Sequence, residues 1–135
     1  MNSHDTIHSL PLDERAFDFV RLIAEGGPAF LTAHLPQQFV VGTTTGASIV
    51  ERDRFIQAAL GRADMVGAKG LSAPHLVGVD VAELGSAYAM LTAHWSMNLP
   101  AGDVELIEDL LVDRTRPEWI CVAYLLRQDL PNLVS

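Results

Sequence analysis

The groups of this sequence that could do chemistry lie on two neighbouring predicted strands. His94 falls in the run 88–99, and Asp113 falls in the next run, 105–115. A histidine with a carboxylate partner can act as a general base, because the carboxylate orients the ring and stabilises the imidazolium that forms. His94 and Asp113 are therefore the candidate catalytic pair.

The alternation of residues in the run 88–99 allows two orientations of His94. One face of this predicted strand is entirely apolar, with Ala89, Leu91, Ala93, Trp95 and Met97, and the other face carries His94. A core buries the apolar face, so the pattern predicts that Trp95 and Met97 line the interior and that His94 points outward. The catalytic hypothesis requires the opposite register, with His94 and Asp113 in one pocket.

Other polar and sulfur-containing residues give weaker signals. Tyr124 is either a core residue with a satisfied hydroxyl or a pocket donor. Cys121 is the only cysteine and lies in an apolar run, which predicts a buried, inert thiol and excludes an internal disulfide. His4 and His8 are four residues apart but show no helical pattern, and no other cluster has ligand spacing. The sequence predicts no metal site and no cofactor.

Composition limits the classes of partner. The 135 residues are 49% hydrophobic and carry a net charge of -8, with Lys69 as the only lysine. An acidic protein without a basic stripe is a poor match for nucleic acid or for an anionic membrane surface. The absence of a secretory pattern and the lone cysteine predict a cytoplasmic location. The apolar excess predicts a lined pocket, a partner interface or both.

The elements that must position these groups follow from hydrophobic periodicity and turn residues. The chain length predicts one domain over residues 12–135 after a flexible N-terminal tail, 1–11. A long helix begins near Leu12 and stops at Gly26-Gly27, and a short helix follows until Pro36. A third helix begins at Ser48 or near Glu51 and ends at Gly61.

The second half of the sequence has the pattern of strands joined by tight turns. Four runs in succession, 75–82, 88–99, 105–115 and 119–129, predict an antiparallel meander. Helices that precede an antiparallel sheet indicate an α+β fold, with a curved sheet wrapped around the long first helix and two further short helices.

Three passages in this order of elements resemble the nuclear transport factor 2-like superfamily, also called SnoaL-like or polyketide-cyclase-like. They are Phe39-Val40-Val41-Gly42 with the turn into Arg52-Asp53-Arg54-Phe55-Ile56, the run 77–91, and Trp119-Ile120-Cys121-Val122-Ala123-Tyr124. The resemblance covers residues 12–130 and implies a cone-shaped domain with a pocket between the helices and the concave sheet, often a homodimer through the outer sheet face. The residues expected to line this pocket are Phe19, Phe30, His34, Phe39, Phe55, Trp95, Met97 and Tyr124.

The resemblance leaves three hypotheses for function, because one fold serves many activities. The first is a homodimer that binds a small, largely apolar molecule. The second is a cofactor-independent isomerase, dehydratase or polyketide-cyclase-like lyase that uses His94 and Asp113. The third is an association module in which aromatic and methionine side chains fill the cone.

Overall fold

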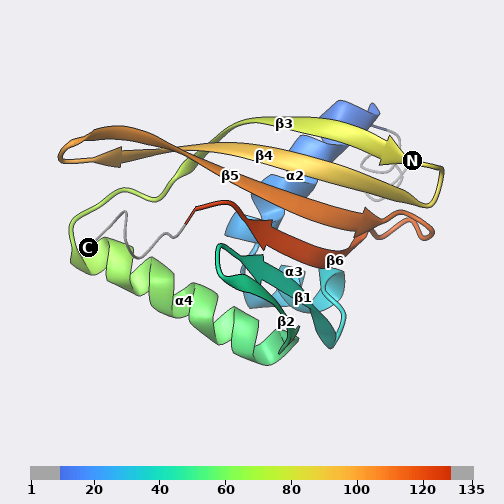
Figure 1. Ribbon diagram of the computed structural model, residues 1–135, viewed down its shortest axis with the longest axis horizontal. Helices are drawn as coiled ribbons and strands as arrows, with labels where there is room; N and C mark the ends of the chain where they lie inside the picture. The colour runs from blue at the N-terminus through green and yellow to red at the C-terminus, as the bar shows by residue number, and fades with distance from the viewer. Residues whose placement is uncertain (1–9, 129–135) are drawn as a thin grey trace.

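The computed structural model describes residues 10–128, which form helices and one six-stranded sheet (Figure 1). Residues 1–9 of the predicted tail and residues 129–135 lie outside the described part. The helices are α2 (Leu12–Glu25), α3 (Gly27–His34) and α4 (Arg52–Ala68). The strands are β1 (Gln38–Thr43), β2 (Gly46–Glu51), β3 (His75–Leu84), β4 (Tyr88–Leu99), β5 (Gly102–Asp113) and β6 (Ile120–Leu126). The predicted α+β class is confirmed.

Helix α2 forms because its apolar residues recur at helical spacing, and it buries Ala16, Phe19, Val20 and Ile23. Acidic residues occupy its first turn, where the positive end of the helix dipole favours them. Gly27, with φ of +78°, takes a conformation that other residues rarely adopt, and the chain turns there into α3. The first two helices therefore begin and end as predicted.

The sheet has the strand order β2-β1-β6-β5-β4-β3 and is mixed rather than wholly antiparallel. Every neighbouring pair is antiparallel except β1 and β6, which run parallel. The predicted antiparallel meander of β3 to β6 is confirmed. The parallel β1–β6 pair was not predicted, because hairpin turns specify only pairings between strands that follow one another in sequence. The pairing of β1 with β6 joins distant segments and depends on the packing of the whole domain.

Helix α4 differs most from its prediction. It spans 17 residues and passes through Gly61, so it is not short, and Gly61 does not end it. Ser48 lies in β2, and the helix begins at Arg52, which agrees with the later of the two predicted starts. A glycine in a helix interior lowers helix stability by about 1 kcal/mol relative to alanine. The hydrogen bonds of the helical turns on both sides of Gly61 outweigh that cost here.

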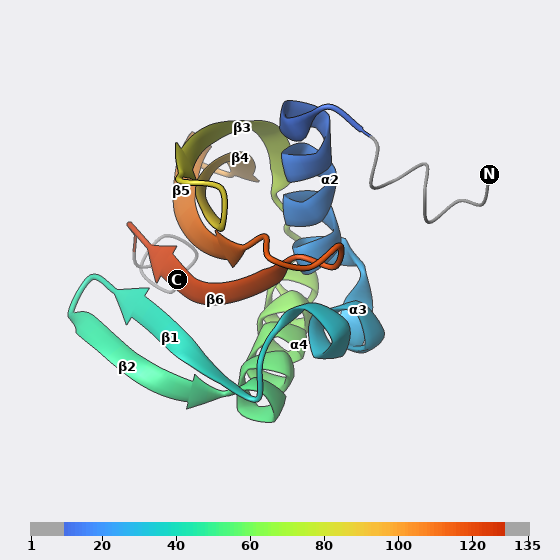
Figure 2. The same ribbon diagram turned by 90° about the vertical axis from the view of Figure 1, so that its right-hand side faces the viewer.

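The inner face of the sheet and the helices share one core. On β4 the apolar set Ala89, Leu91, Ala93, Trp95 and Met97 is buried, as its alternation predicts. The helices gather on the concave side of the sheet, and no described helix covers the opposite, outer face (Figure 2). Helix α4 packs chiefly against α3 and β2 rather than against the centre of the sheet. This arrangement leaves space between α4 and the inner face of β4, β5 and β6.

Candidate functional site

Two adjoining hollows lie between the helices and the inner sheet face, with volumes of about 440 Å³ and 270 Å³. Both are lined by residues of α2, α4, β4, β5 and β6, and the residues that they share include Ala63, Arg62, Trp95, Glu108 and Tyr124. We call the two hollows together the Glu108 pocket. A volume of several hundred Å³ is typical of sites for small molecules.

Glu108 is the acidic residue on the apolar inner face of β5. The strand alternates so that Glu108 shares this face with Leu106, Leu110 and Val112, all of which are buried. Its partner on β4 is Ala93, whose side chain is small and apolar. Desolvation disfavours a charged carboxylate, so burial raises the pKa of Glu108 to about 7. Glu108 can therefore donate or accept a proton near neutral pH.

Two hydrogen-bond donors lie close to this carboxyl group. The Arg62 guanidinium on α4 and the Trp95 indole N–H on β4 both favour the charged form of Glu108 and oppose the larger effect of burial on its pKa. Trp95 is only 7% exposed, and its Nε1 has no well-aligned hydrogen-bond partner among the described residues. A buried donor without an acceptor is unfavourable by about 1–3 kcal/mol. The pocket thus presents donors that a bound molecule could satisfy.

His94 lies on the outer face of β4, away from this pocket. Its ring nitrogens contact Glu105 at 2.9 Å (Nδ1) and Asp80 at 2.8 Å (Nε2). Hydrogen bonds to these two carboxylates, Glu105 first, raise the pKa of His94 above its ordinary value. His94 therefore belongs to an exposed ion-pair cluster that links β3, β4 and β5.

Asp113 also lies on the outer face, at the far end of β5. It pairs with Tyr88 in the sheet, whereas His94 pairs with Ile107. Its Oδ1 accepts hydrogen bonds from the backbone N–H and the hydroxyl of Thr115, which lower the pKa of Asp113. The structure does not bring His94 and Asp113 together, because they lie six positions apart along the paired strands.

The predicted pocket residues fall into two groups. Trp95 and Tyr124 line both hollows, and Phe55 lines the smaller one. The others, Phe19, Phe30, His34, Phe39 and Met97, line neither.

Most of this second group forms an aromatic cluster between α2, α3 and Trp119. Phe30 stacks on His34 with centroids 4.1 Å apart, and Phe19 meets Trp119 edge-on at 5.7 Å. His34 Nδ1 lies 2.8 Å from the Trp119 carbonyl oxygen, which fixes the ring in place. This cluster closes the core at one end.

The sequence prediction missed Glu108 and Arg62. The signal for Glu108 is present, since it interrupts an otherwise apolar alternation from Leu106 to Val112. No comparable signal exists for Arg62, because a charged residue on an amphipathic helix is ordinarily solvated. Only the position of α4 relative to the sheet brings Arg62 to the pocket.

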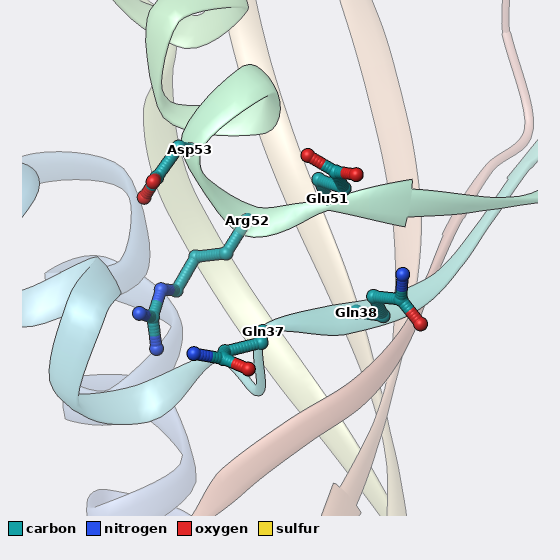
Figure 3. A pocket seen from close by; sticks show the side chains of 5 residues that line it. All are labelled: Gln37, Gln38, Glu51, Arg52 and Asp53. Atoms are coloured by element: carbon teal, nitrogen blue, oxygen red, sulfur yellow. The ribbon is translucent and has the colours of Figure 1, made fainter.

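A third hollow, of about 350 Å³, is polar and lies where β1 and β2 meet the start of α4 (Figure 3). Figure 3 shows the Arg52 side chain extending from the start of α4 towards the end of α3. Its Nη1 donates to the carbonyl oxygens of Thr32 (3.1 Å) and Leu35 (3.2 Å), groups that a helix end leaves unpaired. Arg52 thus joins α3 to α4, which is a structural role.

The described residues contain no group of three or more His, Cys, Asp or Glu that could hold a metal ion. His4 and His8 lie outside this part of the chain. Among residues 10–128, no helix has the length and apolar character that a membrane span requires.

Comparison with known proteins identifies the fold. No protein-family model matches the sequence, and no curated protein matches it either. Solved structures do match. A domain of unknown function with a cystatin-like fold from Nostoc punctiforme has a TM-score of 0.62 at 16% identity, over 93% of this chain and 83% of that chain.

Two further matches are described as NTF2-like. The protein from Novosphingobium aromaticivorans has a TM-score of 0.60 at 15% identity, over 85% of this chain and 81% of that chain. The protein from Cytophaga hutchinsonii has a TM-score of 0.57 at 12% identity, over 93% and 97%. The chain has an NTF2-like fold. At these identities the likeness concerns the NTF2-like fold alone, so the chemistry of the Glu108 pocket must be argued from this chain's own residues.

Proposed function

We propose that this protein binds a small, largely apolar molecule in the Glu108 pocket. The observation that carries the proposal is a pocket lined mainly by apolar side chains, such as Ala63, Val66 and Leu71, in which a few polar groups converge. Apolar walls provide affinity by excluding water, and a few fixed polar groups provide orientation.

The test uses a tryptophan placed inside the pocket. Ala63 lines both hollows from α4, so Ala63→Trp should fill them and abolish the fluorescence gain of a neutral apolar dye such as Nile red. Ala58→Trp is the matched control, because Ala58 is exposed on the same helix and lines neither hollow. Equal dye fluorescence with both variants would contradict the proposal.

Acid–base chemistry on the bound molecule is a second candidate, and the pKa of Glu108 near 7 favours it. The reacting group would then be Glu108 rather than His94 or Asp113, which face away from the pocket. Compounds that bind are incubated with the wild type and with Glu108→Gln and then analysed by mass spectrometry. Conversion by the wild type alone supports catalysis, and recovery of unchanged compound from both excludes it for those compounds.

We also propose that the protein forms a homodimer through the outer sheet face. The strand registers align one apolar row across all six strands: Ile49, Val40, Ala123, Leu111, Met90 and Ala82. Three members are exposed, Ile49 at 73%, Val40 at 37% and Ala82. A continuous apolar row of this kind is typical of a surface that a partner covers.

A further inference from the structure

We infer that the ligand of the Glu108 pocket is an apolar molecule with an anionic oxygen headgroup, a carboxylate above all, bound by Trp95, Arg62 and the neutral form of Glu108. This inference rests on the proposed function and adds the chemical class of the ligand. It depends on which polar groups the pocket presents and on which of them already have partners.

The first step concerns the donors. Trp95 Nε1–H is buried in the wall that both hollows share, and the nearby Glu108 carboxyl is not well aligned to accept from it. An indole N–H can only donate, so a ligand that satisfies it must supply an acceptor. Arg62 lines the same wall, and its guanidinium also only donates. Neither group can be satisfied by an ammonium headgroup.

The second step concerns the acceptors at the pocket. Gln128 Oε1 accepts the backbone N–H of Ile107 at 2.9 Å, so that oxygen already has a partner. Glu25 is engaged by Arg21 at 3.4 Å on the exposed side of α2. Two side chains of the shared wall can accept, the Glu108 carboxyl and the Tyr124 hydroxyl, and each can also donate: the Tyr124 hydroxyl always, and Glu108 once protonated, a form that burial makes accessible near neutral pH.

The third step is the charge that faces Glu108 from each neighbouring element. Arg127, after β6, is held by Asp109 at 2.7 Å, and Cys121 on β6 stays a neutral thiol, since burial raises its pKa to about 12. Tyr124 on β6 and Glu25 on α2 complete the titratable groups at the pocket. With Glu108 neutral, Arg62 remains the uncompensated charge at the shared wall, and it is positive. A carboxylate would neutralise it and accept from both nitrogen donors.

The experiment is isothermal titration of the wild type with three probes that share one tail: octanoate, octan-1-ol and octylamine. We expect octanoate to bind about tenfold more tightly than the alcohol, the scale of one charge-assisted hydrogen bond, and the amine to bind weakest. Octanoate stays ionised from pH 6 to pH 8, so its affinity should fall about tenfold over that range as Glu108 ionises. In Glu108→Gln this pH dependence should shrink to less than about twofold.

Two further variants locate the headgroup. Trp95→Phe keeps an aromatic side chain and removes the N–H, and Arg62→Met removes the charge, so each should weaken octanoate binding more than it weakens octan-1-ol binding. Arg54→Met is the matched control, because Arg54 is exposed on α4 and lines neither hollow. Melting temperatures show whether each variant is folded, and Arg62→Met, on a half-buried helix position, keeps the test valid if Trp95→Phe does not fold.

The outcomes separate the two proposals. If octan-1-ol or octylamine binds as tightly as octanoate, the inferred ligand class is wrong and the pocket remains a binding site. Octanoate binding that Arg62→Met and Glu108→Gln leave unchanged would also overturn the inference, because the headgroup would lie elsewhere. If none of the probes and no dye binds, the proposed function fails together with the inference.

Discussion

The chemical properties of Glu108 depend on its apolar surroundings. The same carboxyl group on the outer face of β5 would be accessible to water, as the exposed side chain of Asp103 is. On the inner face it is desolvated, and its pKa rises to about 7. The position, and not the residue type, makes it chemically distinctive.

The stability of the protein should depend on pH through this residue. Between about pH 4.5 and 7 the folded protein keeps the Glu108 proton that the unfolded chain has lost, so stability falls as pH rises. The wild type should therefore lose about 2 kcal/mol more between pH 5 and pH 8 than Glu108→Gln does. Urea unfolding at both pH values measures the difference. Asp103→Asn, an exposed change on the same strand, should behave like the wild type, and equal pH slopes for the wild type and Glu108→Gln would show that Glu108 is not desolvated.

The sequence could identify part of the site only. The alternation of β4 was enough to place Trp95 inside and to leave His94 outside. The alternation of residues on β5 likewise places Glu108 on the inner face, because its neighbours on that face, Leu106 and Leu110, are buried. Arg62 could not have been found in this way, because its contribution depends on where α4 lies relative to the sheet.

At the scale of elements, the position of α4 creates the pocket. It buries only Ile56 and Val66, so much of its surface faces solvent or the pocket rather than the core. The local pattern also predicted the wrong end for this helix. Glycine commonly ends helices, so the prediction placed the C-terminus of α4 at Gly61. Local rules sufficed for α2 and for the β3–β4 and β4–β5 hairpins, whereas α4 and the parallel β1–β6 pair depend on contacts between distant segments.

Gly61 offers a direct test of this helix. A Cβ added at Gly61 meets nothing within 4 Å, so Gly61→Ala should stabilise the protein by about 0.5–1 kcal/mol by restricting the unfolded chain and favouring the helix. Chemical denaturation measures the change. Gly85→Ala is the informative contrast, because Gly85 has a φ of +66° in the β3–β4 turn and the substitution should destabilise. Destabilisation by Gly61→Ala would indicate that α4 ends or bends at this residue.

At the scale of the whole molecule, the sheet separates two proposed surfaces. The inner face lines the pocket, and the outer face carries the apolar row from Ile49 to Ala82. The apolar excess of the composition is thus divided between a core with a pocket and an uncovered face. A second copy of the chain on that face would bury the row without blocking the pocket.

The proposed dimer can be tested by charge substitution. Ile49→Glu and Val40→Glu should each convert the dimer to a monomer in sedimentation at micromolar concentration, because a buried, unpaired carboxylate is strongly unfavourable. Ala58→Glu, on the exposed side of α4, should leave the dimer intact. A monomeric wild type, or dimers that survive both outer-face substitutions, would contradict the proposal.

Ligand binding in the Glu108 pocket can be tested most directly through the two indole N–H groups of the protein. Trp95 Nε1 lies beside Glu108 in the pocket without a well-aligned hydrogen-bond partner, and Trp119 lies in the aromatic cluster beside Arg15. In a ¹H–¹⁵N spectrum recorded during titration with octanoate, the Trp95 indole signal should move and saturate while the Trp119 signal stays in place. A Trp95 signal that does not move, or a shift confined to Trp119, would contradict the account.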